Sequence, residues 1–541
     1  MLVTLSPSKL KYSTLTLVAL VLLCYTYVSV TNGVCTWFDP LVGFETLQDW
    51  LYGGKWNTVN YADINNNLQP TQHYLNWWSP GQYMLPYLFI KWLGVPIATA
   101  EVITITLCGV ISIMGYYTLM QRLRVSITVM YVVLIMLVCN RNFFWHYLVY
   151  FGGETLLWAA APWLVCVLIT KFNYSYKYMC IAFFLGIVGV FLKTSFVIIY
   201  IATAVYLFVS STISIAQLLQ LKRYKPYVAM VLSVVGVYVF YLSKGLTPST
   251  TMDLTMTNGV PNTLLADFAH PWSALVTHFF KIADVLQNIA PALNTKGIDV
   301  AWLLLPFVFI SVIVCIYLIR KRAEHATYLL ATVMYVVTAS IFMWYYLQNK
   351  AVSYETRHYY FVGNMAGIAI LQALYTNYKQ LFKAVVVLLL IFSAADCSRF
   401  MKRAKQIEQE YTWYSGIKVQ TNVLPALAVI DAELAKDTTL VLHTDATYTR
   451  YLFKHKCTTV CITTNPMNKR HYIQNMYINL DTTAVVTLPI NCYGKRTLIV
   501  HTNALKNCSF NDLQHLYTTP TQYISYYNKL PNYLVAVVSS K

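Results

Sequence analysis

The chain has few charged residues. Asp, Glu, Lys and Arg together make up 11% of its 541 residues, whereas ordinary soluble domains carry about 25%. Hydrophobic residues make up 57%, and the mean hydropathy is +0.50. This balance is typical of a membrane protein and excludes an ordinary soluble domain.

Several chemical motifs are absent as well. The 12 cysteines have no metal-binding spacing, and the chain has no glycine-rich phosphate loop, no Asp-x-Asp pair, no internal repeat and no low-complexity segment. Five cysteines are expected outside the cytoplasm, where disulfides form, although the sequence does not give their pairing: Cys35, Cys457, Cys461, Cys492 and Cys508. No metal site is indicated.

The net charge of +18 is spread over short clusters between apolar runs. Such clusters fix membrane topology and meet anionic headgroups, so nucleic-acid binding is not expected. Eleven runs are long enough to cross a bilayer: 12–31, 97–119, 125–140, 151–170, 177–192, 195–212, 226–243, 300–319, 326–346, 359–375 and 382–397. The first run has the length of an uncleaved anchor, which is longer than the apolar core of a signal peptide.

The positions of the basic residues predict the topology. With a cytoplasmic N-terminus, the connections near residues 121–124, 171–177, 222–225, 320–322 and 379–383 are cytoplasmic, and each is basic. The outer loops are then 32–96, 244–299 and 347–358, and an odd number of spans leaves the C-terminus outside. We expect a polytopic α-helical protein of the plasma (inner) membrane. Within the second outer loop, residues 271–293 predict an amphipathic helix lying on the membrane.

The composition changes near residue 400. Residues 402–410 predict a charged helix leaving the membrane, and short β-rich runs follow at 438–443, 458–463, 484–488, 497–500 and 533–538, with a helix at 446–456. This order predicts a small α/β domain outside the cytoplasm. The predicted division is a membrane domain over 1–397 and an extracytoplasmic domain over 398–541, referred to below as the tail.

The first outer loop holds the carboxylates Asp39, Glu45, Asp49 and Asp63. Solvated loop charges are the simpler interpretation of any one of them. Asp39 differs because it follows the first span by only a few residues, at the level where Trp37 and Phe38 mark the membrane interface. A carboxylate there is placed for acid–base chemistry on a lipid-linked substrate, where partial desolvation raises its basicity.

These residues, with others, resemble the GT-C superfamily of integral-membrane glycosyltransferases, which includes the aminoarabinose lipid A transferases and the protein O-mannosyltransferases. Asp39 followed by Gly54-Lys55-Trp56 resembles the first-loop pattern. The resemblance continues through Ser79-Pro80-Gly81-Gln82-Tyr83 to Gly94, through the glycine-rich run ending at Lys193, and through Glu355-Thr356-Arg357-His358. It covers about residues 12–375. The chain departs from the pattern at Pro40, where members often have Glu, and at Gly81, which replaces a second proline.

The resemblance implies transfer of a sugar from a polyprenyl-phosphate donor to a lipid, glycan or protein acceptor at the outer face, with inversion and no cofactor. Asp39 would be the general base, with Glu45 or Glu154 as a second catalytic carboxylate. Lys193 and Arg357 would bind the donor phosphate. The expected substrate-lining residues are Trp56, Trp78, Tyr83 and His358, although Trp78 also suits an interface anchor, Lys193 a snorkelling lysine and Arg357 a local partner of Glu355.

Other classes of protein remain as alternatives. An envelope-polysaccharide polymerase or ligase usually carries its main catalytic loop late in the chain, whereas the acidic loop here follows the first span. A transporter or flippase of lipid-linked sugars would need charged or broken spans and usually repeats. A membrane anchor with an active tail is disfavoured because the tail has no nucleophile elbow, zinc spacing or phosphate loop.

Overall fold

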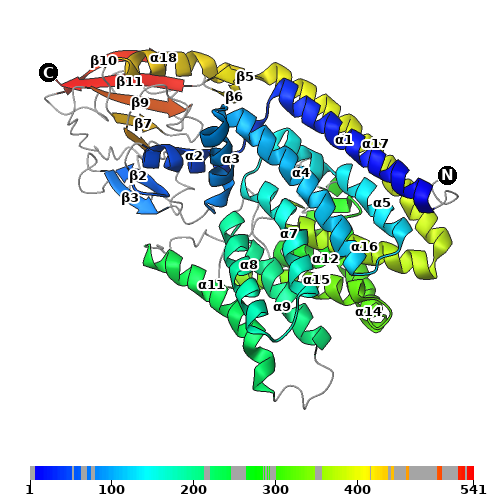
Figure 1. Cartoon of the computed structure of the whole chain (residues 1–541). Coiled ribbons are helices and arrows are strands. Elements are labelled where there is room, and N and C mark those ends of the chain that lie inside the picture. The colour runs from blue at the N-terminus through cyan, green and yellow to red at the C-terminus, as the bar shows by residue number, and fades with distance from the viewer. Residues whose placement is uncertain are drawn as a thin grey trace.

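The computed structural model describes residues 7–51, 54–62, 70–74, 79–211, 220–244, 264–283, 285–286, 289, 292, 300–347, 356–414, 416–436, 440–443, 458–461, 496–502, 522–529 and 533–540. Most of these residues are helical (Figure 1). The long helices are α1 (Pro7–Asn32), α4 (Ile97–Arg122), α5 (Ile127–Val138), α7 (Gly153–Thr170), α8 (Tyr176–Leu192), α9 (Phe196–Ser211), α11 (Lys225–Ser243), α14 (Val300–Arg320), α15 (Ala326–Leu347), α16 (Tyr360–Asn377) and α17 (Lys379–Glu410).

Each of the eleven predicted runs coincides with one of these helices. By length and composition, six of the described helices could cross a membrane, or seven if α5 and the bent segment Arg141–Tyr147 form one span. The segments Tyr176–Leu192, Phe196–Ser211 and Lys225–Phe240 are apolar but shorter. The structure therefore supports a multi-pass membrane protein, and the full count of eleven spans stays a prediction.

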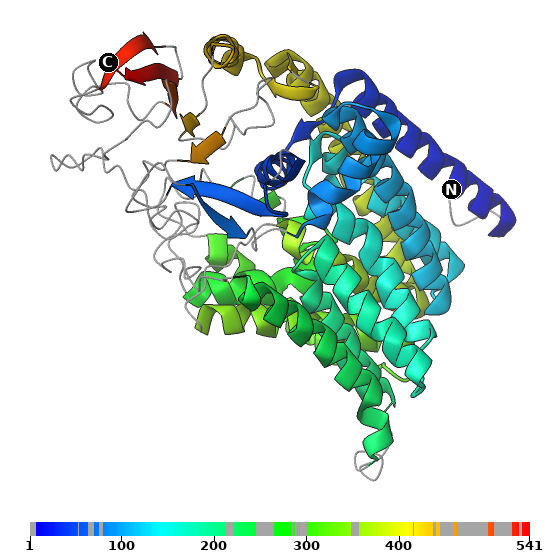
Figure 2. The same cartoon turned by 60° about the vertical axis from the view of Figure 1, so that its left-hand side comes forward.

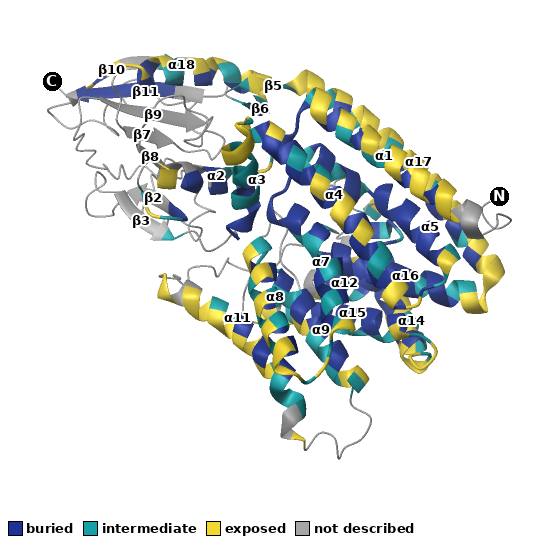
Figure 3. Ribbon diagram, viewed as in Figure 1, coloured by how far each residue is buried: buried dark blue, intermediate teal, exposed yellow. Residues whose placement is uncertain are grey.

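Large apolar side chains face outward on the peripheral helices. Phe309 on α14 is 69% exposed and Ile391 on α17 is 60% exposed, and Figure 3 shows exposed faces along α1, α11 and α17. Soluble monomers rarely expose continuous apolar surface of this kind. Lipid chains would cover these faces in a membrane.

Helices α1 and α17 lie side by side along one edge of the helical region (Figure 1). The Tyr25 and Phe400 rings are 4.6 Å apart, and Asn32 Nδ2 donates to the Ala404 carbonyl at 3.4 Å. The charged helix predicted at 402–410 is continuous with the last apolar run, so α17 is 32 residues long and about 48 Å in length. It connects the helical region directly to the tail.

The basic connections gather at one end of the helical region. His325 Nε2 lies 3.0 Å from the Arg124 carbonyl, and Lys225 Nζ donates to the Tyr176 hydroxyl at 3.1 Å. The loop after α4 thereby meets the loop after α14, and the loop after α7 meets the start of α11. The beginnings of α7 and α16 lie at the opposite end.

A small sheet closes that opposite end. Its strands are β4 (Val149–Tyr150), β1 (Cys35–Thr36), β6 (Ile417–Gln420) and β5 (Tyr411–Tyr414), in that order. β1 pairs in parallel with both β4 and β6. Three segments from distant parts of the chain, after α1, before α7 and after α17, are therefore held together.

The first outer loop is folded. It contains α2 (Phe38–Leu51), the antiparallel pair β2 (Thr58–Ala62) and β3 (Pro70–Tyr74), and α3 (Gly81–Leu93). α3 begins directly after Pro80 and ends at Gly94, whose φ of 64° is the left-handed conformation that glycine adopts at helix ends. The residues from Ser79 to Gly94 that carry part of the resemblance are therefore this helix and its two ends.

The second outer loop differs from its prediction. α12 spans Leu264–Thr277, so it starts earlier than the predicted 271–293, and a turn separates it from further helical residues that begin at Ile282. It packs inside the helical region, where the Tyr335 hydroxyl donates to the Trp272 carbonyl and Ser311 Oγ donates to the Ser273 carbonyl at 3.1 Å. Its apolar face is covered by α14, α15 and α16 instead of lying on the membrane surface.

The tail contains a five-stranded sheet in the order β10 (Gln522–Lys529), β11 (Tyr533–Ser540), β9 (Arg496–Thr502), β7 (Leu440–His443) and β8 (Thr458–Cys461), with α18 (Leu424–Leu434) beside it. Four of the five predicted strands are confirmed. The predicted strand 484–488 and helix 446–456 lie outside the described residues, and β10 was not predicted. Figure 2 shows β2 and β3 between this sheet and the helical region.

Candidate functional site

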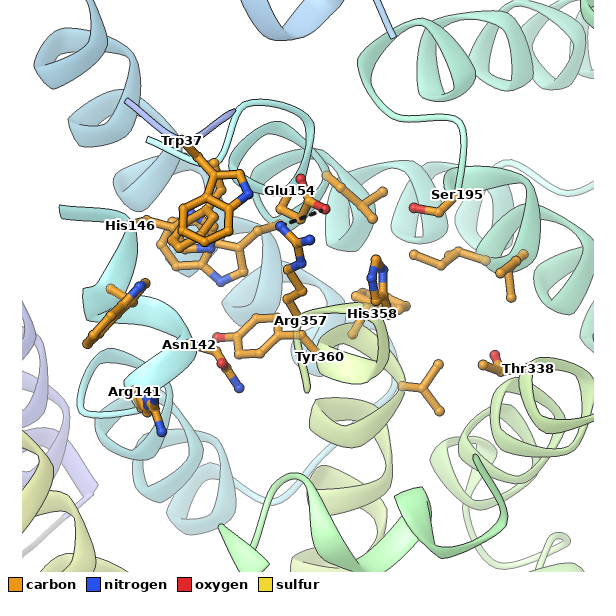
Figure 4. Close-up of a pocket in the computed structure, with 18 of the residues that line it drawn as sticks. Trp37, Arg141, Asn142, His146, Glu154, Ser195, Thr338, Arg357, His358 and Tyr360 are labelled. Atoms are coloured by element: carbon orange, nitrogen blue, oxygen red, sulfur yellow. Dashed lines mark ion pairs between the residues drawn. The ribbon is translucent and has the colours of Figure 1, made fainter. Parts of the chain in front are cut away.

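A cavity of about 280 Å³ lies at the end of the helical region where α7 and α16 begin (Figure 4). Its wall comes from segments spread over most of the chain. Aromatic and aliphatic side chains make most of the wall, and polar groups are few: Arg141, Asn142, His146, Glu154, Ser195, Thr338, Arg357, His358 and Tyr360. A mostly apolar wall with a few polar groups is the usual composition of a small-molecule site.

Two cations converge on one buried carboxylate in this wall. Lys193 Nζ lies 2.8 Å from Glu154 Oε1, and Arg357 Nη1 lies 3.6 Å from the same oxygen. The Glu154 side chain is 6% exposed. Glu154 is in the first turn of α7, where the helix dipole favours a negative charge. The sequence prediction named all three residues, and the structure brings them together.

Two glycines make this arrangement sterically feasible. Gly152 has a φ of 63°, a conformation that side chains rarely adopt. A Cβ at Gly153 would lie 2.6 Å from Lys193 Cδ. The Lys193 side chain therefore passes over the start of α7 only because position 153 has no side chain.

The small sheet places the aromatic part of the wall. β1 and β4 are parallel and end at Thr36 and Tyr150, so the residues that follow them emerge at the same edge. These residues are Trp37 and Phe151, whose rings lie 5.3 Å apart. The Trp37 ring is also 5.9 Å from the Arg357 guanidinium carbon, within the range of a cation–π contact.

Two histidines in the wall have different roles. His146 stacks on Trp158 at 5.2 Å and its Nδ1 lies 2.8 Å from Thr155 Oγ1, which fixes its ring. His358 is beside the cation pair. Desolvation in the cavity, together with the charges of Arg357 and Lys193, lowers the pKa of His358 to about 3 despite the opposing effect of Glu154. His358 is therefore neutral near pH 7.

The remaining predicted site residues are placed less directly. Asp39 and Glu45 belong to α2, but their side chains lie outside the described residues, as does Trp78. Asp39 is in the first turn of α2, two residues after Trp37. Trp56 packs against Tyr74 at 5.8 Å, and Tyr83 is fully buried and donates to Asn57. Neither Trp56 nor Tyr83 is among the residues that line this cavity.

The sequence prediction missed several wall residues, of which Arg141 is the most informative. It follows α5 in the segment Asn140-Arg141-Asn142, where it is the basic residue of a connection that the topology predicts at the outer face. A basic residue against the positive-inside pattern was a signal that could have identified it. Its guanidinium carbon lies 5.2 Å from the Trp145 ring.

Among the described residues, no three His, Cys, Asp or Glu side chains gather as they would around a metal ion. The polar groups of the cavity are two arginines, one lysine-bound carboxylate, amides, hydroxyls and neutral imidazole. This set is suited to binding an anion and hydroxyl groups.

Comparisons with known proteins place the fold. No protein-family model matches the chain, and no curated protein matches it. A solved structure does: the crystal structure of ArnT from Cupriavidus metallidurans in the apo state aligns over 97% of this chain and 98% of that one, with a TM-score of 0.50 and 11% identity. The chain has the GT-C fold.

Further GT-C structures match less closely. ArnT from Cupriavidus metallidurans bound to undecaprenyl phosphate aligns over 97% of both chains, with a TM-score of 0.47 and 10% identity. The arabinofuranosyltransferase AftD from Mycobacteria aligns over 98% of this chain and 41% of its own length, with a TM-score of 0.47 and 10% identity. In this chain the cavity is built from the starts of α7, η3 (Thr356–Tyr359) and α9, close to α2.

Proposed function

We propose that this protein is a membrane glycosyltransferase that transfers a sugar from a polyprenyl-phosphate donor to an acceptor at the outer face. The convergence of Lys193 and Arg357 on Glu154 at the cavity carries this proposal. The GT-C fold supports the same class of reaction. The acceptor is a lipid, a glycan or a protein.

The charges of the cluster suit such a donor. Lys193 and Arg357 carry two positive charges and Glu154 carries one negative charge, which leaves a net charge of +1. The phosphodiester of the donor carries one negative charge, and the phosphate that leaves gains a second. Cations placed where negative charge develops lower the barrier of the reaction. Glu154 then acts as a positioning residue that holds both cations at the cavity.

Asp39 is the proposed general base. It lies in the first turn of α2, directly after the cavity-lining Trp37. It would accept a proton from the acceptor hydroxyl or amine while that group attacks the anomeric carbon. A single displacement inverts the configuration at that carbon. Glu45 is six residues further along α2, and it is the alternative carboxylate on the same helix.

The proposed topology follows from the basic connections. Eleven spans with a cytoplasmic N-terminus put the cavity, the first outer loop and the tail on the extracytoplasmic side of the plasma membrane. The clustering of loops from Arg124, Tyr176, Lys225 and His325 at the other end supports this orientation. A lipid-linked donor on the outer leaflet would then reach the cavity without crossing the membrane.

The test is an assay of purified protein with a panel of polyprenyl-phosphate sugars, following release of the lipid phosphate. We expect turnover with at least one donor and an acceptor mixture. Asp39→Asn should lower kcat by about 100- to 10,000-fold, the usual contribution of a positioned base. Lys193→Met and Arg357→Met should raise the donor KM and lower kcat, because both cations would face the charge that develops on the leaving phosphate.

Asp49→Asn is the matched control, because it changes a carboxylate on the same helix as Asp39. Glu45→Gln tests the alternative base. Full activity in Asp39→Asn with loss in Glu45→Gln would move the base to Glu45. If no donor on a broad panel is used by the folded wild type, the glycosyltransferase proposal is wrong. The polymerase and transporter interpretations would then have to be tested.

A further inference from the structure

The charges in the cavity wall indicate which chemical class of sugar the cavity would bind. Among the described residues that line the cavity, Glu154 is the only carboxylate. Its Oε1 is shared by Lys193 and Arg357. Arg141 adds another positive charge from a separate element, α6 (Arg141–Phe144). The wall is therefore cationic on more than one side.

Arg141 differs from Arg357 in its surroundings. No Asp or Glu among the described residues lies within 4.0 Å of its guanidinium. It is placed instead by the Trp145 ring at 5.2 Å. Figure 4 shows Arg141 on the side of Arg357 that is away from Ser195 and Thr338, so the two arginines lie at different places in the wall.

The rest of the wall suits a ring that carries hydroxyl groups. Trp158, stacked on His146, offers an aromatic face. The Thr338 hydroxyl and Glu154 Oε2 are buried and have no hydrogen-bond partner. Buried polar atoms without partners are uncommon in native proteins, and a ligand is one explanation for them.

The size of the cavity limits the ligand. At about 280 Å³ it is close to the lower end of the range for small-molecule sites, which is about 300 to 1,000 Å³. One sugar ring is therefore a better match than a disaccharide.

From these observations we propose that the cavity binds one sugar ring bearing hydroxyl groups, and that Arg141 excludes a sugar bearing an ammonium group. An ammonium group would be repelled by Arg141 and Arg357, and Glu154, the one carboxylate among the described wall residues, already faces two cations. This inference rests on the proposed function and adds the class of sugar. Arg141 is the specificity-determining residue.

The experiment uses two polyprenyl-phosphate donors that share one sugar ring and differ only by a hydroxyl or an ammonium group at a single position. For the full-length wild-type protein, kcat/KM with the hydroxyl donor should be at least about tenfold higher than kcat/KM with the ammonium donor. Arg141→Glu should reduce this preference by about tenfold or reverse it. Arg141→Gln should give an intermediate preference, and its melting temperature shows whether the site is still folded.

Arg320→Glu is the matched control, because it makes the same charge change at the opposite end of the helical region and should leave the preference unchanged. Equal use of both donors by the wild type would overturn the inference while the proposed function stands. A preference that is unaffected in both folded Arg141 variants would overturn the role of Arg141. Competition by polyprenyl phosphate without a sugar separates the proposed function from the inference about the sugar. If this lipid phosphate does not bind and neither donor is used, the proposed function is wrong, and the inference about the sugar is wrong with it.

Discussion

At the scale of single residues, the site depends on one carboxylate shared by two cations. Glu154, Lys193 and Arg357 come from α7, the end of α8 and η3. A buried charge is tolerated only when it is paired, because removal of water from a charge is unfavourable. Removal of any one of these three charged groups would therefore leave a buried charge without its partner, whether or not substrate is bound.

The first prediction concerns the Glu154–Lys193 pair. A double-mutant cycle with Glu154→Gln and Lys193→Met should give a coupling energy of about 1 to 3 kcal/mol in protein unfolding, because both side chains are largely buried. The Lys321–Glu324 pair is the control, since both of its side chains are exposed. Lys321→Met and Glu324→Gln should show no measurable coupling. Equal coupling in the two cycles would contradict the burial argument.

A second prediction concerns pH. The pKa of His358 is about 3 in the folded protein, below its value of about 6.5 in an unfolded chain. Between these two values the unfolded state binds the extra proton, so stability falls as the pH is lowered from 6.5. Melting temperatures measured from pH 7 to pH 4 should fall less in His358→Gln than in the wild type. If melting temperature falls with pH by the same amount in the wild type and in His358→Gln, His358 is not buried in its neutral form.

At the scale of elements, helices approach closely where glycines replace side chains. On α16, Gly367 lies against the ring of Phe279, and a Cβ at Gly363 would lie 2.7 Å from His278 Cβ. Beyond this contact, Lys281 Nζ bonds Asp396 Oδ2 of α17 at 2.7 Å, and both side chains are buried. The second outer loop is therefore fixed to the two helices that flank the site.

The third prediction tests this contact. Gly367→Ala should lower stability by about 1 to 3 kcal/mol, because the added methyl group overlaps a buried ring. Gly236→Ala is the matched control on α11, where nothing lies within 4 Å of the added carbon. It should be neutral or stabilise by up to about 1 kcal/mol through helix propensity. Melting temperatures of both variants in detergent decide the outcome, and equal changes would contradict close packing of the loop.

At the scale of the whole molecule, the helical region carries its basic connections at one end and its cavity at the other. α17 continues out of the helical region and leads into the tail. The loop strands β2 and β3 lie on the same side as the tail sheet. This polarity predicts one orientation in the membrane.

The fourth prediction gives that orientation. Alkaline phosphatase fused after Lys541 should be active, because this enzyme folds only outside the cytoplasm. The same enzyme fused after Arg322 should be inactive, whereas a fluorescent protein fused there should be bright. Phosphatase activity at both positions, or at Arg322 alone, would contradict the predicted topology.

The sequence by itself determined the features that depend on neighbouring residues. An apolar run of sufficient length forms a helix in lipid because its backbone groups have no other partners, so all eleven runs coincide with helices. The same local information placed Lys193 and Arg357 at the cavity end. It also located four strands of the tail, since short β-rich runs are a local pattern.

Only the tertiary structure decided which distant residues meet. Glu154 and Lys193 are 39 positions apart, and the parallel pairing of β1 with β4 and β6 joins residues near 35, 149 and 418. Periodicity contains no information on such contacts, because they depend on how whole helices pack. For the same reason α12 was predicted on the membrane surface although neighbouring helices cover it. Arg141 did have a local signal, its basic charge against the positive-inside pattern, and that signal was not used.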